Sequence, residues 1–474
     1  MKRPLALALG PALAAATVLL PAPGALATEG WHVLGMAAWM ALWWLTAAIP
    51  LEATALLPLV MLPITGVAPV TDVAPAYADP IIFLFMGGFF LAAALERWNL
   101  HRRFALATVR VVGTDARRVV LGFMIASAFA SMWISNTATA IMMLPIAMAV
   151  LGPADVRPLH RNVGIALMLG IAYGASIGGV ATLVGTPPNA ILAGAVRTML
   201  GRELDFASWM MVGVPIAVPM LALCWLWLVY LFKVRGSIAG LAESVERERR
   251  QHGPLGPGER YVLLVFVGTA AAWVLRAPKV IGDLRIPGLT DLIPYVSDAS
   301  IAIAAALLLF VRFLRGDRHT VVLDWETAER VPWGILLLFG GGLALAGAFE
   351  SSGLTTWLGG GLASMRGVPL PVVAAATAGV FVFLTELTSN TATAALGMPL
   401  MASVAEGLGV AALPLMAVAA LASSMAFMLP VATPPNAIVY GSGVVPPGAM
   451  ARAGLGLNLI AIVVVTLAVW IWAG

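Results

Sequence analysis

Long apolar runs constrain the fold of this chain more than any other feature of its sequence. Runs of about 18 or more mostly apolar residues recur along the 474 residues, and only 11% of the residues are charged. Within lipid the backbone must satisfy its own hydrogen bonds, which helices do over such lengths. The sequence therefore predicts an all-α polytopic membrane protein, and it excludes a large soluble core.

The apolar runs define eleven expected membrane-spanning helices. These cover residues 4–21, 31–49, 52–67, 80–97, 162–184, 206–232, 260–275, 298–314, 331–350, 412–431 and 451–472. Two further apolar stretches, 117–152 and 368–405, are interrupted by polar residues, so each half is too short to span the membrane alone. We expect both to be re-entrant helical hairpins, whose irregular tips must be surrounded by protein or by a water-filled cavity.

The distribution of basic residues supports this topology. With the N-terminus in the cytoplasm, the inner segments carry 21 of the 27 Lys and Arg residues, and the outer segments carry 6. Such an excess is typical of cytoplasmic connections. The charged segment 234–259 is then a cytoplasmic linker between two halves of the chain. An amphipathic surface helix is the alternative for its Glu/Arg run.

The first segment, 1–30, allows two interpretations. Lys2 and Arg3 precede an apolar run and an Ala-Leu-Ala sequence, a pattern shared with cleavable signal peptides. We favour a retained first transmembrane helix and loop, because a chain with so many later spans needs no cleaved signal. The single cysteine, Cys224, excludes an internal disulfide framework.

Three blocks of sequence occur twice, in the same order. Residues 83–96 resemble 337–350, and "SNTATA" at 135–140 recurs at 389–394 with the same offset of 254. "TPPNAI" at 186–191 recurs at 433–438. Chance similarity among helices rich in Ala, Leu and Gly explains the first block alone, but not all three. We therefore expect two repeats, which cover residues 31–233 and 260–474.

The two repeats are expected to be inverted with respect to each other. Five spans separate their starting points, and an odd number reverses the direction of the second copy. Glu96 precedes the basic sequence "RWNLHRR", whereas Glu350 precedes "SSGLTTWLGGG", which has no basic residue. Inverted repeats with broken helices are typical of secondary transporters, in which the binding site lies near the membrane midplane.

The repeated polar blocks supply oxygen atoms without fixed positive charge. Their hydroxyl and amide oxygens suit hard cations, whereas the N–H groups of helix N-termini suit anions. The prolines of each TPPN block remove N–H donors and interrupt the helix. We expect broken helices over 162–197 and 412–440, with free carbonyls at Gly185 and Ala432. Two hairpin tips and two breaks would then enclose one site.

The charge balance of this site points to cation coupling. No Lys or Arg occurs in either SNT tip or near either TPPN block, so helix dipoles and bound cations would have to balance a dianion. Glu386 is the one carboxylate of this region, and an acid within the membrane is a functional candidate by default. A structural hydrogen-bonding role is the equally weighted alternative, because Met132 occupies the corresponding position of the first repeat.

The chain resembles the divalent anion:sodium symporter (DASS) family, and most closely its bacterial INDY-type dicarboxylate transporters. The resemblance rests on two SNT motifs, two TPPN breaks, "FLFMGGFFLAAALERWNLHRR" and "DWETAERVPWGILLLFGGGLALA". It implies a multi-pass homodimer in the inner (plasma) membrane, with a scaffold domain and a transport domain that moves as an elevator. No organic cofactor or nucleic-acid partner is expected. A membrane-embedded enzyme is a less favoured alternative, since Glu386 alone supplies no titratable pair.

The resemblance also implies which residues bind sodium and substrate. The first sodium site would comprise Ser131, Ser135, Asn136 and Gly185, and the second would comprise Thr385, Thr388, Asn390 and Ala432. Substrate contacts are expected from Ser135, Asn136, Thr137, Thr186, Ser389, Asn390, Thr391, Thr433 and Pro434. Relatives often have Ala in place of Thr388 and Ser in place of Thr186, and citrate-preferring relatives have Gly in place of Ser135.

The sequence therefore predicts a symporter that imports a C4 dicarboxylate, such as succinate, malate or fumarate, together with two or more sodium ions. Three alternatives remain open: a sodium-independent dicarboxylate exchanger, a symporter for citrate or sulfate, and an anion channel. An exchanger of this kind should carry a fixed positive side chain in place of a cation site, and none is visible in the sequence.

Overall fold

The computed structural model of the chain is predominantly helical, as predicted. It describes residues 3–100, 102–104, 107–108, 113–151, 158–237, 253–281, 284–311 and 321–473. The predicted cytoplasmic linker lies mostly outside the described residues, which omit 238–252. The assignment of the cytoplasmic side used several basic residues that also lie outside the described part of the chain, among them Lys2 and Arg157.

The described elements fall into one group before the linker and one group after it. The described elements up to the linker are α1 (Arg3–Leu19), α2 (Thr28–Thr46), α3 (Leu51–Thr54), α4 (Leu57–Ile64), α5 (Val70–Val73), η1 (Ala74–Ala78), α6 (Pro80–Arg97), α8 (Ala116–Ser131), α9 (Asn136–Leu151), α10 (Pro158–Gly179), α11 (Pro187–Leu200) and α12 (Phe206–Leu231). Those after the linker are α14 (Pro257–Val274), β1 (Lys279–Ile281), β2 (Leu284–Ile286), α15 (Leu289–Leu292), α16 (Asp298–Phe310), α17 (Trp325–Ala328), α18 (Trp333–Ser351), α19 (Leu354–Gly360), η2 (Ala363–Met365), α20 (Leu370–Thr385), α21 (Asn390–Leu408), α22 (Ala412–Ser423), α23 (Pro434–Gly441) and α24 (Pro447–Ala473).

Three pairs of helices in the two repeats begin at equivalent residues, and one of these pairs also ends at equivalent residues. Helices α8 and α20 both have 16 residues and are related by the offset of 254 at each end. Helices α9 and α21 both begin at the asparagine of their SNT motif, and α11 and α23 both begin at the first proline of TPPN. The duplicated sequence blocks therefore specify duplicated local structure.

Helices α6 and α18 run in opposite directions, as inverted copies require. The rings of Phe85 and Phe339, which occupy equivalent positions of the two repeats, meet edge to face with centroids 4.9 Å apart. Beyond this crossing, Arg97 at the end of α6 forms an ion pair with Asp324, which lies before the start of α18. Residue numbers thus rise along α6 while they fall along α18.

Both polar-interrupted stretches form pairs of helices around an SNT tip. A 16-residue helix such as α8 or α20 is about 24 Å long at ~1.5 Å per residue, which is less than the ~30 Å hydrocarbon core. A single arm is therefore too short to cross the bilayer alone. That the two pairs are re-entrant hairpins stays a prediction.

The TPPN segments interrupt their helices, although the unwinding begins earlier than expected. Helix α10 ends at Gly179 rather than at 184, and α22 ends at Ser423 rather than at 431. Thr186 and Thr433 are extended, with φ of −147° and −140°, as residues that precede proline usually are. The extra unwound residues are stabilised by side-chain contacts that no local pattern reveals.

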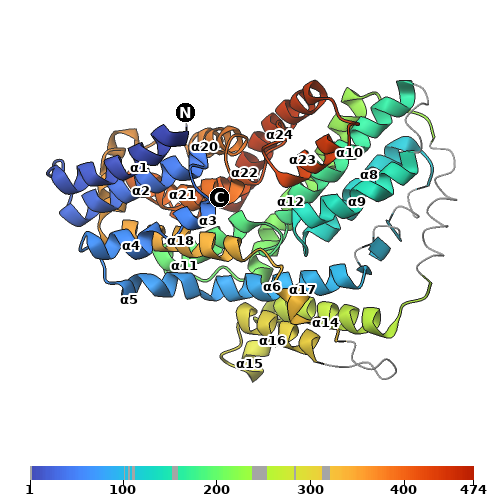
Figure 1. Cartoon of the computed structure of the whole chain (residues 1–474), viewed down its shortest axis with the longest axis horizontal. Coiled ribbons are helices and arrows are strands. Elements are labelled where there is room, and N and C mark those ends of the chain that lie inside the picture. The colour runs from blue at the N-terminus through green and yellow to red at the C-terminus, as the bar shows by residue number, and fades with distance from the viewer. Residues whose placement is uncertain are drawn as a thin grey trace.

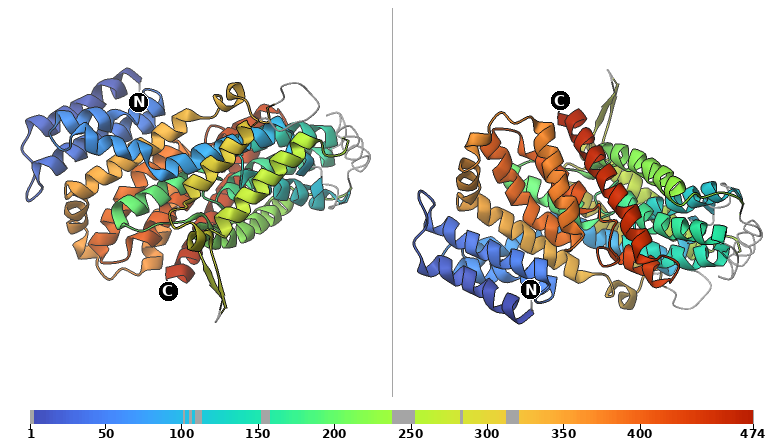
Figure 2. Two further views of the ribbon diagram at one scale, coloured as in Figure 1. Left: turned by 90° about the horizontal axis from the view of Figure 1, so that it is seen from below. Right: turned by 90° about the horizontal axis from the view of Figure 1, so that it is seen from above.

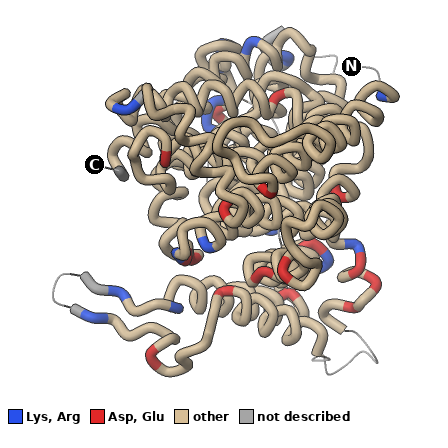
Figure 3. Tube along the Cα trace, turned by 90° about the vertical axis from the view of Figure 1, so that its left-hand side faces the viewer, with Lys and Arg blue, Asp and Glu red and all other residues tan. Residues whose placement is uncertain are grey.

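Helices occupy all eleven of the predicted spans, but not all of these are long and continuous. The span expected over 52–67 consists of the short helices α3 and α4, because Pro58 and Pro63 restrict the backbone there. Among the described residues, five helices are long and apolar enough to cross a membrane, and other apolar helices such as α1 and α16 are shorter. Most of the trace carries no charged residue (Figure 3).

The first helix is packed against the second at one edge of the molecule (Figure 1). Trp43 Nε1 donates a hydrogen bond of 3.0 Å to the carbonyl of Ala6, and Gly10 lies against the rings of Trp39 and Trp43. At another edge α14 and α16 lie together below α6, and strands β1 and β2 form a short antiparallel hairpin that projects from the helices (Figure 2).

Glycines bring the backbones of α8 and α10 into contact. A Cβ atom added to Gly174 would lie 2.9 Å from the carbonyl oxygen of Met124, and one added to Gly178 would collide with the backbone of Ala128. The spacing of four residues places both glycines on one face of α10, and small residues allow such close helix packing in lipid. This packing holds the first SNT tip against the first broken helix.

We expect Gly178→Ala to lower the free energy of unfolding by about 1–3 kcal/mol, because the added methyl group must displace backbone atoms of Ala128. Thermal unfolding of the purified protein measures the effect. Gly268→Ala in α14 is the matched control, since no atom lies within 4 Å of the position of its Cβ. Equal melting temperatures for the two variants would contradict the proposed packing.

Candidate functional site

Both SNT tips and both TPPN breaks line a single cavity of about 490 Å³. The predicted site residues that line it are Ser135, Asn136, Thr137, Gly185, Thr186, Thr388, Ser389, Asn390, Thr391, Ala432, Thr433 and Pro434. Cavities of roughly 300–1,000 Å³ are usual for small-molecule ligands. The fold thus brings together segments of the two repeats that are far apart in the sequence.

The two remaining predicted residues, Ser131 and Thr385, lie directly behind the tips and are fully buried. Ser131 Oγ donates a hydrogen bond to Asn136 Oδ1, and Thr385 Oγ1 donates one of 2.7 Å to Asn390 Oδ1. Each tip asparagine is therefore oriented in the same way, by a hydroxyl group five residues earlier in the chain. All predicted site residues are accordingly in or next to the cavity.

Four helices begin at this cavity. The first residues of α9, α11, α21 and α23 all line it; they are Asn136, Pro187, Asn390 and Pro434. The N-terminus of a helix carries unpaired N–H groups and a partial positive charge, which together favour bound anions. None of the described residues that line the cavity is Lys, Arg or His. Its attraction for an anion therefore comes from backbone dipoles and neutral polar groups.

The carboxyl ends of four other helices adjoin the same tips. Helices α8 and α20 end at Ser131 and Thr385, which hydrogen-bond to the two tip asparagines. Thr385 Oγ1 also lies 2.8 Å from the carbonyl oxygen of Ser423, the last residue of α22, and Gly179 ends α10 beside Asn136. Helix C-termini carry partial negative charge, so this side of each tip suits a cation.

Oxygen atoms converge where the first sodium site was predicted. A Cβ atom added to Gly179 would lie 2.7 Å from Asn136 Oδ1 and 2.9 Å from the carbonyl oxygen of Gly185, so both oxygens face the same small space. Neutral oxygen donors of this kind are the ligands that hard cations prefer. Among the described residues, no cluster of His, Cys, Asp and Glu is suited to a multivalent metal. The donors present fit a sodium ion.

The second predicted sodium site has related but different contacts. Thr388 Oγ1 donates to the carbonyl of Leu384 at 2.9 Å and lies 2.6 Å from Thr393 Oγ1. Ile134 occupies the position of Thr388 in the first repeat, where the buried hydroxyl of Thr139 has no hydrogen-bond partner among the described residues. Thr393 was not predicted, although its repetition within SNTATA was a visible signal.

The asparagine of each TPPN motif holds its unwound segment together. Asn189 Nδ2 donates to the carbonyl of Gly179, and Asn436 Nδ2 donates to the carbonyl of Ala426, both at 3.2 Å. The acceptor lies ten residues upstream in each repeat, and both asparagines are fully buried. These residues do not line the cavity, so the repeated motif indicated their importance but not their structural role.

Glu386 is a structural partner of the second broken helix. Its carboxylate accepts hydrogen bonds from the backbone N–H groups of Phe427 (2.6 Å), Met428 (2.8 Å) and Leu429 (3.1 Å), and from Asn458 Nδ2 (2.8 Å). It is 3% exposed and is absent from the lining of the cavity. The unwound segment after α22 frees these N–H groups, and the carboxylate satisfies them. Of the two interpretations left open, the geometry favours the structural one.

The first repeat makes the corresponding connection with a hydroxyl group. Thr182 Oγ1 donates to the carbonyl of Met132, the residue equivalent to Glu386, and accepts a hydrogen bond of 3.0 Å from the backbone N–H of Gly185. Both hairpin tips are thus tied to the adjacent broken helix. Because the hydroxyl of Thr182 makes this connection in the first repeat and the carboxylate of Glu386 makes it in the second, only the second repeat needs an acid at the position of Glu386.

Helices α2, α3, α6 and α18 complete the wall of the cavity. Their contribution is mostly apolar and includes Trp44, Phe85, Phe89 and Leu338, together with the carboxylate of Glu52. Sequence analysis missed these residues, because an apolar residue that lines a cavity looks like any other residue of an apolar helix. Glu52 alone had a recognisable signal, as an acid near the start of an apolar run.

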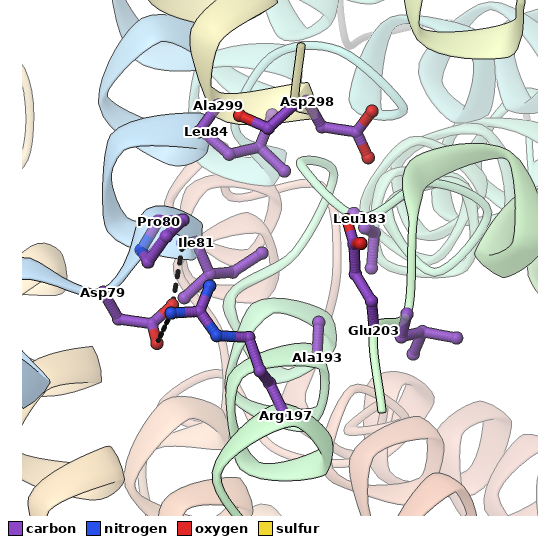
Figure 4. A pocket seen from close by; sticks show the side chains of 12 residues that line it. Asp79, Pro80, Ile81, Leu84, Leu183, Ala193, Arg197, Glu203, Asp298 and Ala299 are labelled. Atoms are coloured by element: carbon purple, nitrogen blue, oxygen red, sulfur yellow. Dashed lines mark hydrogen bonds and ion pairs between the residues drawn. The ribbon is translucent and has the colours of Figure 1, made fainter. Parts of the chain in front are cut away.

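A second, much smaller cavity of about 50 Å³ lies between α6, α11 and α16 (Figure 4). Asp79 accepts a hydrogen bond of 2.9 Å from the backbone N–H of Ile81, at the start of α6, and pairs with Arg197 of α11 at 3.2 Å. Glu203 and Asp298 line the same cavity. The cavity is thus small and is lined by paired charges.

Arg276 extends this group of charges at the end of α14. Its guanidinium pairs with Asp298 at 2.8 Å and with Glu203 at 2.9 Å, and Asp298 also accepts a hydrogen bond of 2.8 Å from the backbone N–H of Phe206. Arg276 is only 8% exposed. These contacts join the connection between α11 and α12 to the ends of α14 and α16.

Sequence comparison identifies the family. Residues 2–474 match the family described as "Sodium:sulfate symporter transmembrane region". The chain belongs to this family of membrane transporters.

It is 42% identical over 460 residues to the "Sodium-dependent dicarboxylate transporter SdcS" of Staphylococcus saprophyticus, with 94% of this chain and 87% of that protein covered. SdcS of Staphylococcus aureus is 40% identical over 458 residues, with the same coverage. The predicted resemblance to the DASS family is confirmed, and these proteins are transporters rather than enzymes.

Two solved structures share the fold at low sequence identity. MtrF of Neisseria gonorrhoeae, described as illuminating a class of antimetabolite efflux pumps, aligns with a TM-score of 0.59 and 12% identity over 99% of this chain and 94% of MtrF. The YdaH transporter of Alcanivorax borkumensis aligns with a TM-score of 0.52 and 15% identity over 93% of this chain and 98% of YdaH. At such identities the likeness shows the fold alone.

We expect Glu386→Ala to lower the free energy of unfolding by at least about 2 kcal/mol, since one buried and two partly buried N–H groups would lose their acceptor. Glu386→Gln retains one oxygen acceptor and should cost less. Thermal unfolding in the absence of ligands separates the two variants. An unchanged melting temperature combined with lost transport would instead assign Glu386 a direct role in transport.

Proposed function

We propose that this chain is a sodium-coupled symporter that imports C4 dicarboxylates such as succinate, malate and fumarate across the plasma membrane. The observation that carries the proposal is the convergence of four helix N-termini and two oxygen-rich tips on one cavity, whose described lining has no basic side chain. The names of the SdcS relatives, which are sodium-dependent dicarboxylate transporters, support the same substrate class.

Electrostatics explains why cations would accompany the substrate. Burying charge within the membrane is costly, and each helix terminus contributes a partial charge of only about half an elementary charge. Two sodium ions would balance the two carboxylates, so that the loaded site carries little net charge. Sodium bound at Asn136 and Asn390 would also orient both tips before the dianion arrives.

The proposed substrate contacts follow from the positions of the helix N-termini. The two carboxylates of the dianion would meet residues 136–137 at the start of α9 and residues 390–391 at the start of α21. Thr186 and Thr433, which precede α11 and α23, would add hydroxyl and backbone contacts. Ser135 favours a C4 dicarboxylate over citrate, because citrate-preferring relatives carry Gly there. The family description names sulfate, so sulfate remains the second candidate substrate.

The movement proposed is that of an elevator. The two hairpins and the two broken helices would move as a transport domain against a scaffold that includes α2, α6 and α18, within a homodimer whose N-termini are cytoplasmic. The cavity extends to Glu52, which contacts Gly334 at the start of α18. The ion pair of Arg97 and Asp324 also lies next to the start of α18, so the cavity reaches towards the side of the membrane that contains this pair. The positive-inside assignment makes this side cytoplasmic. The structure then represents an inward-facing state.

We expect an inward sodium gradient to drive succinate uptake into vesicles that contain the protein, and replacement of sodium by potassium to reduce uptake to background. Asn136→Ala and Asn390→Ala should each abolish sodium-dependent uptake, because each removes the amide oxygen of one tip. Thr71→Ala, at an exposed position, should transport normally. Radiolabelled succinate measures the initial rate, and a melting curve of each variant verifies folding.

Three results would contradict this proposal. Uptake that is unchanged without sodium would favour the exchanger. Saturable uptake of citrate or sulfate, with no competition by succinate, would refute the substrate class. Current that is neither saturable nor dependent on sodium would indicate a channel.

We expect Arg276→Gln to favour the outward-facing state, since it removes the ion pairs with Glu203 and Asp298 that close the outer side. Leu183, which is buried in the small outer cavity, can be replaced by Cys in a Cys224→Ser background. A membrane-impermeant thiol reagent should then label the new cysteine faster when Arg276 is replaced. Arg285→Gln, which removes an exposed pair with Asp291, is the control. Equal labelling rates would rule out this role.

A further inference from the structure

Two glycines touch at the centre of the first sodium site. Gly179 is the last residue of α10, and Gly185 precedes Thr186. A Cβ atom at Gly185 would collide with the Gly179 carbonyl group and lie 2.9 Å from its Cα, and one at Gly179 would lie 2.9 Å from the Gly185 oxygen. Neither glycine has a positive φ. The requirement for glycine at these positions therefore arises from space and not from backbone conformation.

The second repeat has alanine at both corresponding positions. Asn189 and Asn436 donate to Gly179 and Ala426 respectively, at the same distance and the same spacing, so Ala426 occupies the place of Gly179. Ala432 precedes Thr433 as Gly185 precedes Thr186. The second broken segment therefore accommodates two methyl groups for which the first has no room.

The helix that precedes each break also has smaller residues in the first repeat than in the second. Gly174 and Gly178 of α10 allow the backbone of α8 to approach closely. At the TPPN offset of 247, the corresponding residues of the second repeat are Leu421 and Met425. The first hairpin is thus held tightly against its broken helix by small residues, whereas the second repeat has larger, buried residues at the corresponding positions. The close approach at Gly179 is part of a longer tight contact.

The two atoms that face Gly179 are the predicted cation ligands. Asn136 Oδ1 and the Gly185 carbonyl oxygen lie 2.7 and 2.9 Å from the position that its Cβ would take. A methyl group there would occupy space between the ligands or push them apart. No such effect applies to the second site, because Ala426 already carries its methyl group and is fully buried.

We propose that Gly179 is a positioning residue of the first sodium site, because its missing side chain lets Asn136 Oδ1 and the Gly185 carbonyl face one cation. The two sodium sites are consequently not equivalent, and a single methyl group separates them. This inference rests on the sodium coupling proposed above. It goes beyond that proposal by assigning the requirement for glycine to one site only.

The test is Gly179→Ala in the full-length protein, reconstituted in vesicles, with succinate uptake measured against sodium concentration. The half-saturating sodium concentration should rise by about tenfold or more, which corresponds to the loss of roughly one strong cation contact. The Hill coefficient for sodium should fall towards one, since the weakened first site fills only at a higher sodium concentration than the second. The KM for succinate at saturating sodium should change little. A purely structural defect would lower the maximal rate without altering the sodium dependence.

Ala426→Gly is the matched control, because it removes a methyl group at the equivalent position of the second repeat. Its sodium dependence should stay within about twofold of the original, as expected for a substitution that opens space without moving a ligand. An equal change in sodium dependence for Gly179→Ala and Ala426→Gly would overturn the inequivalence of the sites. An unaltered sodium dependence of Gly179→Ala would overturn the role of Gly179 itself.

Melting temperatures provide a second readout in case Gly179→Ala is too unstable for transport assays. Gly179→Ala, Asn136→Ala and the double variant are compared in sodium chloride and in choline chloride. If the methyl group acts through Asn136, the double variant lowers the melting temperature by less than the sum of the two single variants. Sodium should then raise the melting temperature of each single variant by less than that of the original protein. Strict additivity, or failure of both Gly179 variants to fold in either salt, would overturn the inference.

Failure of this inference can be distinguished from failure of the proposed function. Uptake by the unsubstituted protein that is independent of sodium would refute sodium coupling, and the inference with it. Sodium-dependent uptake that responds equally in the unsubstituted protein and in Gly179→Ala would overturn the inference alone.

Discussion

The cost of burying charge inside a membrane is the constraint on which the rest of this structure depends. The described lining of the cavity offers no basic side chain to offset that cost. Partial positive charge comes instead from the N-termini of α9, α11, α21 and α23. A helix can end at membrane depth only if it is broken there, so the hairpin tips and the TPPN breaks follow from the need for charge without basic residues.

Breaking a helix inside a membrane frees backbone groups that must find other partners. Asn189 and Asn436 hold carbonyl groups of the two unwound segments, and Thr182 satisfies the N–H of Gly185. Glu386 does the same for three consecutive N–H groups of the second segment. These side chains maintain the geometry of the cavity although they do not line it. They contribute to function indirectly, because they hold the backbone around the cavity in place.

The two repeats share a fold but differ in local chemistry. The offset of 254 preserves helix boundaries and the hydroxyl-to-asparagine hydrogen bond of each tip. It does not preserve the link between tip and broken helix, which is a hydroxyl in one repeat and a carboxylate in the other. Gly179 and Gly185 of the first repeat correspond to Ala426 and Ala432 of the second. The two copies of the scaffold are thus alike in fold and different in the residues around their tips.

The sequence by itself determined the helices, the two polar tips and the two breaks. These are local features: apolar runs set helix positions, the prolines of TPPN mark the start of a new helix after each break, and an exact repeat marks what both copies need. Only the tertiary structure decided that Glu386 is structural, that Glu52 and Phe89 reach the cavity, and that Gly179 lies against Gly185 and Asn136. Those facts depend on contacts between helices far apart in the chain, and an apolar helix looks the same from its sequence whether its face meets lipid, another helix or a bound ion.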